Sequence, residues 1–106
     1  MAKYVDYFVT EENKAPFLEW SDNLEIKCQI IVDRFIQRVA NGGAKKSVKS
    51  LKNNIFEIKI PYASGLRVYF FEEGDKIVLL LGGDKKTQAK DIKKAKEYRS
   101  YYGQQK

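Results

Sequence analysis

The sequence predicts an α+β fold in which a helical pair packs on one face of a small antiparallel sheet. Two patterns carry this prediction. Apolar residues recur at steps of three and four through residues 24–39, which is typical of an amphipathic helix. They alternate singly with polar residues through 56–60 and 66–70, which is typical of strands. The expected order is β-α-α-β-β-β-α, ending in a C-terminal helix.

The first half of the chain is expected to form one strand and two helices. Residues 4–10 mix aromatic and β-branched side chains, which predicts a strand at a sheet edge. Pro16 suits the first turn of a short helix. Asp22, with Glu25 three residues later, predicts a capping box for a second, longer helix, which Gly42 and Gly43 end. The apolar stripe of that helix is Leu24, Cys28, Ile31, Phe35 and Val39.

Residues 45–54 are rich in lysine and poor in apolar side chains, so they predict a basic loop or a frayed strand. Two interpretations stay open for this segment. It can be an arm that follows a phosphate backbone without reading sequence, or it can be a solvated loop. The lysines concerned are Lys45, Lys46, Lys49 and Lys52.

The central hairpin places two sets of residues on opposite faces. Folding the strands back over the link at 61–65 brings the apolar residues of one strand opposite those of the other, for example Ile58 opposite Val68. The same register puts Lys59 beside Arg67 and Glu57 beside Tyr69. This polar face is either a functional surface or simply the solvated side of an antiparallel sheet.

The third strand of this sheet, 77–81, is apolar at every position, so both of its faces should be covered. An even-numbered turn would place Leu81 with the core set, and Val78 and Leu80 on the other face. The last helix or a partner protein would cover that second face. Thr87 is expected to cap the last helix, and the tail 103–106 is expected to be disordered.

The composition is that of one globular domain covering residues 1–106. Its single cysteine excludes an internal disulfide and fits a reducing, cytoplasmic compartment. No segment is long and apolar enough to span a membrane, and the N-terminus lacks a secretion-signal pattern. The net charge of +6 comes from the chain after residue 44, an asymmetry that favours a polyanionic partner over a generic solubilising surface.

Several segments together carry a family resemblance. They are FLEW at 17–20 ahead of a long helix, FEIKI at 56–60, GLRVYF at 65–70 and LLGGDKKTQ at 80–88. On these residues the chain resembles the RelE/ParE superfamily of type II toxins, and within it the phage-derived Gp49-like, HigB-type branch of addiction module killer proteins. Members of that branch usually carry Arg where this chain has Lys59, and an aromatic residue where it has Leu66.

The resemblance implies an mRNA endoribonuclease that acts on translating ribosomes and is held inactive by a cognate antitoxin. RNA can be cut without metal or water because its own 2′-OH is the nucleophile. The sequence has no His, one Cys and no paired acidic motif at ligand spacing, so we expect a metal-independent site that needs no cofactor.

The candidate catalytic residues lie on the hairpin and at the exit of the third strand. Arg67 is the first choice for binding the scissile phosphate and stabilising its transition state. Lys59 is a second clamp or a general base, and Glu57 is the alternative base or a salt-bridge partner. By resemblance, Lys85 acts on the leaving group, with Lys86 as a weaker second. Tyr69 either stacks on a base or packs in the sheet.

Two other functions remain open. A ParE-like gyrase inhibitor would act through its helical pair or tail and would not depend on these basic residues. A noncatalytic basic module would bind nucleic acid with a steep salt dependence and cut nothing. Fold alone does not separate these functions.

Overall fold

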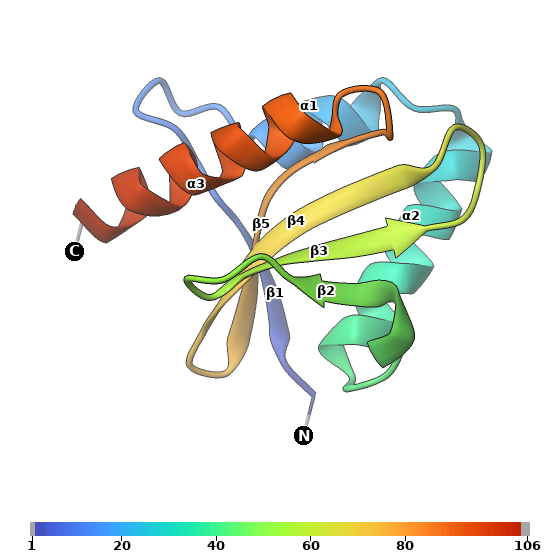
Figure 1. Cartoon of the computed structure of the whole chain (residues 1–106), viewed down its shortest axis with the longest axis horizontal. Helices are drawn as coiled ribbons and strands as arrows, with labels where there is room; N and C mark the ends of the chain where they lie inside the picture. The colour runs from blue at the N-terminus through green and yellow to red at the C-terminus, as the bar shows by residue number, and fades with distance from the viewer. Residues whose placement is uncertain (1, 105–106) are drawn as a thin grey trace.

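The computed structural model describes residues 2–104 and forms one five-stranded sheet with helices on both faces (Figure 1). The elements in chain order are β1 (Tyr4–Tyr7), α1 (Pro16–Asp22), α2 (Ile26–Ala40), the 3-10 helix η1 (Lys45–Ser47), β2 (Val48–Ser50), β3 (Ile55–Ile60), β4 (Leu66–Glu73), β5 (Lys76–Gly83) and α3 (Gln88–Gln104).

The strands lie in the order β1-β5-β4-β3-β2, and only β1 runs parallel to its neighbour. The α+β class and the edge position of the first strand are confirmed, although β1 ends at Tyr7. The expected order lacked β2. This strand forms in the lysine-rich segment because Val48 pairs with Ile58 and packs against the core. The free edge of β1 is partly blocked, since the Asp6 carboxylate accepts a 2.8 Å hydrogen bond from the Tyr7 N–H.

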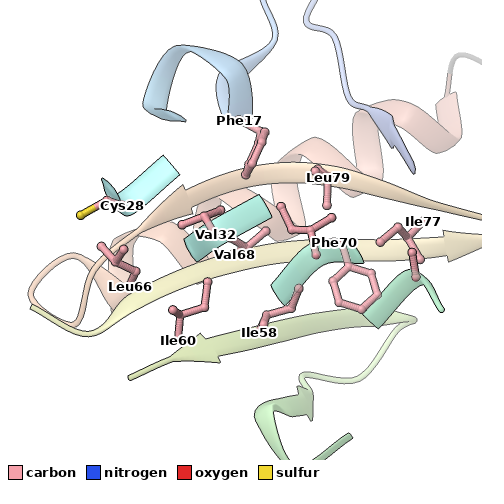
Figure 2. Close-up of a cluster of buried hydrophobic side chains, with 12 residues drawn as sticks. Phe17, Cys28, Val32, Ile58, Ile60, Leu66, Val68, Phe70, Ile77 and Leu79 are labelled. Atoms are coloured by element: carbon pink, nitrogen blue, oxygen red, sulfur yellow. The ribbon is translucent and has the colours of Figure 1, made fainter. Parts of the chain in front are cut away.

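Helices α1 and α2 cover one face of the sheet and enclose the larger core, which Figure 2 shows. The buried line of α2 differs from the predicted stripe. Only Cys28 of the predicted set is fully buried, and the other four members are partly buried at the margin of the core. The residues that face the sheet are spaced four apart: Cys28, Val32, Ile36 and Ala40.

The predicted capping box at the start of α2 is wrong. Asp22 is the last residue of α1, and Glu25 itself is the N-cap of α2 without a side-chain capping bond. The chain turns between the two helices by main-chain bonds, such as that from the Leu24 N–H to the Ser21 carbonyl at 3.0 Å. No capping side chain is therefore needed to make the turn.

The predicted register of the hairpin is confirmed, with Lys59 opposite Arg67 and Glu57 opposite Tyr69. The prediction for the next strand fails at one residue. A β-bulge between Tyr69 and Phe70 shifts the pairing with β5, so Leu81 joins Leu80 on the second face instead of the core face.

Helix α3 covers this second face, packing Ala95 and neighbouring aromatic residues onto β4 and β5. The face is therefore closed by the chain itself, not left for a partner. The helix continues through Gly103 and Gln104, so the expected disorder of the tail is wrong for these two residues, while 105–106 lie outside the described residues. Stacking of Phe8 on Tyr98 and a tilted ring contact between Phe71 and Tyr102 anchor these last turns.

Two adjacent glycines at the end of β5 allow close packing from both faces. A Cβ on Gly82 would lie 2.1 Å from the Trp20 ring of α1, and one on Gly83 would lie 1.9 Å from the Asp91 carboxylate of α3. Both layers therefore approach the strand backbone directly. This contact explains the pair without any nucleotide-binding loop.

Candidate basic groove

A groove with a volume of about 290 Å³ lies beside the link between β3 and β4. We call it the basic groove. Three cations from three different segments of the chain line it: Lys46 from η1, Lys59 from β3 and Arg67 from β4. The remaining lining residues are Ser47, Ile60, Pro61, Gly65 and Leu66. No carboxylate lines this groove within residues 2–104, so the charged side chains that line it are all positive.

Arg67 is the most firmly held cation of the basic groove. Only 11% of its side chain is exposed, and its Nη1 donates a 2.8 Å hydrogen bond to the Gly65 carbonyl. Gly65 has φ of +80°, and a Cβ there would lie 3.2 Å from Arg67 Nη1. The same point is 3.7 Å from Lys85 Cβ, so Lys85 stands at the rim of the groove. A guanidinium fixed in this way can present its outer N–H groups to a phosphate.

Glu57 lies behind Arg67 and is fully buried. Its Oε2 is 3.7 Å from Arg67 Nε and accepts a 2.9 Å hydrogen bond from Gln88 Nε2. A carboxylate with no exposed surface does not reach a molecule bound in the groove. This arrangement corresponds to the salt-bridge alternative for Glu57, in which it orients Arg67 from behind.

Tyr69 is also fully buried, underneath α3. Burial raises the pKa of its hydroxyl well above the ordinary value of 10.0, and the nearby Glu57 carboxylate raises this pKa further. The ring has no exposed face on which a base could stack. Its position corresponds to the packing alternative.

The remaining predicted cations are exposed but do not all reach the basic groove. Lys45 lines a different cleft of about 400 Å³, together with Val39 and Phe56. Lys49 lies on the edge strand β2, and Lys52 lies in the turn that follows it. Lys86 precedes α3. Of the predicted set, the structure thus brings together Lys46, Lys59, Arg67 and Lys85.

Two residues of this region were not assigned roles from the sequence. Ser47 lines the groove, and Gln88 holds Glu57. The sequence signals for Gln88 are its place directly after the predicted cap Thr87 and its place at the end of the resemblance segment 80–88, neither of which indicated a role. Ser47 carried no signal, because the turn that forms η1 was not expected.

No three His, Cys, Asp or Glu side chains come together as a metal site within residues 2–104. No helix formed by these residues has the length and apolar character needed to cross a membrane.

Comparison with known proteins gives a family. The sequence pattern of the family described as "Phage derived protein Gp49-like (DUF891)" matches residues 19–100, which include all of α2, the four strands β2 to β5 and most of α3. The chain is also 35% identical to an uncharacterized protein of Haemophilus influenzae, across 69% of this chain and 90% of that protein.

The molecule is thus a small α+β domain with a cluster of cations in a groove on its hairpin. The protein belongs to the Gp49-like family of phage-derived proteins.

Proposed function

We propose that this protein is the toxin of a type II toxin–antitoxin system and a metal-independent mRNA endoribonuclease. The observation that carries the proposal is the convergence of Lys46, Lys59 and Arg67 in one groove, with Lys85 at its rim. Within residues 2–104 one carboxylate pairs with one of these cations: Glu57 is buried behind Arg67, which leaves the front of the groove positive. Membership of the Gp49-like family is compatible with a toxin role.

In the proposed reaction the 2′-OH of a nucleotide attacks the adjacent phosphorus. A bond forms between O2′ and phosphorus, the bond from phosphorus to O5′ breaks, and the products are a 2′,3′-cyclic phosphate and a 5′-OH. Charge accumulates on the non-bridging phosphate oxygens in the transition state. Arg67 meets this charge with preorganised N–H donors, which is the main contribution expected from such a site.

Two proton transfers accompany the attack. Lys59 would accept the proton of the 2′-OH, and Lys85 would donate a proton to the departing O5′. Both side chains are exposed, as contact with a substrate requires. Glu57 is assigned no proton transfer, because its buried position suits the holding of Arg67.

The partners follow from the same proposal. The substrate would be an mRNA that is being translated on a ribosome. Its backbone would lie across the basic groove. A cognate antitoxin would oppose this activity by covering the groove with an acidic segment, since α3 already closes the apolar face of the sheet. Such an antitoxin would be encoded next to this protein. Loss of growth arrest when the antitoxin is co-expressed, together with formation of a stable complex, would support the proposed antitoxin.

The test is induced expression of wild type and Arg67→Ala in bacteria, with mapping of mRNA 5′ ends. We expect cuts within translated reading frames, with 5′-OH ends, in the wild type and none in Arg67→Ala at equal protein levels. Arg34→Ala is the matched control, because Arg34 is an exposed arginine on the opposite face, on α2. This variant should cut like the wild type.

Two other outcomes overturn the proposal. Growth arrest without cleavage, equal in wild type and Arg67→Ala, would point to a gyrase inhibitor, which a DNA supercoiling assay would then identify. RNA binding without any cleavage or arrest would point to a noncatalytic binding module.

A further inference from the structure

The last turns of α3 form a second basic hollow, far from the basic groove along the helix. It has a volume of about 330 Å³ and is lined by Asn53, Ile55, Lys96, Arg99, Ser100 and Gly103. We call it the Arg99 hollow. It lies where the C-terminal end of α3 meets the turn between β2 and β3, whereas α3 begins near the opposite end of these strands (Figure 1).

Arg99 is held in a fixed orientation. The carbon at the centre of its guanidinium lies 4.5 Å from the centroid of the Phe71 ring, which is itself fully buried. Such stacking over an aromatic face orients the planar group and leaves its N–H fork available at the edge. The Arg99 Nε is enclosed and has no hydrogen-bond partner within residues 2–104.

The charge of the Arg99 hollow is not neutralised. Within residues 2–104 neither Lys96 nor Arg99 forms an ion pair, unlike Arg67, which is paired with Glu57. Asn53 and Ser100 add a carboxamide and a hydroxyl at the same place. Gly103 leaves the guanidinium uncovered, because a Cβ there would contact Arg99 Nη1 at 3.6 Å.

The two sides of α3 differ in sign. The side that faces β2 carries Lys96 and Arg99, whereas the side that faces β1 contributes Glu97 to a different hollow that also contains Glu11 and Glu12. An anion that approaches this end of the helix is therefore attracted on one side and repelled on the other. This asymmetry distinguishes the Arg99 hollow from a generic solubilising surface.

The Arg99 hollow and the contact that supports Arg67 lie toward opposite ends of α3. Gln88, the first residue of α3, holds the Glu57 carboxylate that pairs with Arg67. Arg99 follows three turns later, about 16 Å along the helix axis. A stacked nucleic-acid strand carries one phosphate per about 3.4 Å, so about five nucleotides cover this distance, and fewer suffice in an extended strand.

We propose that the Arg99 hollow binds a second phosphodiester of the same single-stranded RNA that the basic groove holds, several nucleotides from the bond that is cut. The inference rests on the proposed function for the identity of the ligand. Arg99 grips the two non-bridging oxygens through its fork, and Lys96 adds a point charge. The hollow fixes the direction of the strand along α3 without reading its sequence.

The test measures binding of 2′-O-methyl RNA, which cannot be cut, to the wild-type protein and its variants by fluorescence anisotropy. Oligonucleotides of about 4 and about 12 nucleotides are compared, because only the longer one spans both sites. Arg99→Gln should weaken binding of the longer RNA about tenfold and lower its salt slope by about 1, while binding of the shorter RNA changes less than about twofold. Arg99→Lys should bind the longer RNA with an affinity between those of the wild type and Arg99→Gln, because it keeps the charge and loses the fork of N–H donors.

Lys94→Gln is the matched control. Lys94 is an exposed cation of the same helix that does not line the Arg99 hollow, and its replacement removes the same charge. Its effect on the longer RNA should be less than about twofold. Thermal unfolding of each variant shows whether the loss of the stack on Phe71 has disturbed the fold, and Lys96→Gln, which keeps this stack, should reproduce the length dependence.

Equal effects of Arg99→Gln and Lys94→Gln, or equal effects on both RNA lengths, would overturn the inference. Failure of the proposed function gives a different pattern. If Arg99→Gln has a length-dependent effect on binding but no mRNA is cleaved in cells, the proposed nuclease activity is wrong and the second binding site is supported. If cleavage depends on Arg67 but Arg99→Gln has no effect on binding, the proposed function is supported and the Arg99 binding site is wrong.

Discussion

Gln88 Nε2 donates a 2.9 Å hydrogen bond to Glu57 Oε2, joining the first turn of α3 to a carboxylate that has no exposed surface. The same oxygen lies 3.7 Å from Arg67 Nε. The orientation of the arginine therefore depends on a helix that lies far from it in sequence. A buried carboxylate needs such partners, because an unpaired one is strongly destabilising.

Replacement of Gln88 by Ala should destabilise the protein by about 1–3 kcal/mol, because it leaves a buried charged oxygen without its neutral donor. The free energy of unfolding measured with urea checks this. Lys90→Ala is the control, since Lys90 is an exposed residue in the same turn of α3 and should change stability by less than about 0.5 kcal/mol. Equal stability of wild type and Gln88→Ala would show that this hydrogen bond contributes nothing.

The adjacent residues Lys45 and Lys46 should differ in their effect on function. Lys46 lines the basic groove, whereas Lys45 lines a separate cleft with Val39. Lys46→Ala should reduce mRNA cleavage about tenfold by weakening a phosphate contact, and Lys45→Ala should leave it within about twofold. The rate of cleavage of a reporter mRNA measures both. A larger loss in Lys45→Ala would place the substrate in the other cleft.

Alanine at Gly82 or Gly83 should prevent stable folding or cost at least about 3 kcal/mol, because the new methyl groups would overlap Trp20 and Asp91. Gly103→Ala is the matched control. Its methyl group meets only Arg99 Nη1, at 3.6 Å, so the expected change in stability is within about 1 kcal/mol. Circular dichroism during thermal unfolding separates these cases. Normal unfolding temperatures for both Gly82→Ala and Gly83→Ala would refute the close packing of the two layers at β5.

Tyr69 should make the protein less stable at high pH. Burial raises the pKa of its hydroxyl in the folded state above the ordinary value of 10.0. Below that pH the Tyr69 hydroxyl is protonated in both the folded and the unfolded state, so it contributes no pH dependence to stability. Above it the unfolded state loses its proton while the folded state keeps it, so the free energy of unfolding falls by up to about 1.4 kcal/mol per pH unit.

The variant Tyr69→Phe removes this group and should unfold with a weaker dependence on alkaline pH. Urea unfolding of both proteins at about pH 8 and about pH 11 measures the difference. The two proteins differ only at this residue, so the contributions of all other groups cancel in the comparison. If the two proteins lose the same stability between these pH values, Tyr69 does not have the raised pKa.

The hairpin was predictable from the sequence because local patterns determine it. Alternation along β3 and β4 and a short link leave one register, and the pairing of Lys59 with Arg67 follows directly. The bulge after Tyr69 was not predictable, since nothing in the run of apolar residues marks which one is left unpaired. That single irregularity moves Leu81 to the other face.

The sequence left open how the polar face is buried. Its patterns placed Glu57 and Tyr69 together and named the last helix or a partner protein as the cover, but did not decide between the two. The apolar residues of α3 are spread among many lysines, so its buried side is weakly marked. The basic groove depends further on η1, which brings Lys46 next to residues distant in sequence. Contacts of this kind are set by tertiary packing, which local periodicity does not encode.

The parallel pairing of β1 with β5 has a consequence for the order in which the fold can form during synthesis. Strand β1 is made well before its partner β5, because two α-helices and three strands lie between them in the chain. Helix α3, which holds Glu57 through Gln88, is made after all five strands. In the nascent chain β1 therefore waits unpaired until β5 is made, and Arg67 lacks the support of Gln88 until α3 is made.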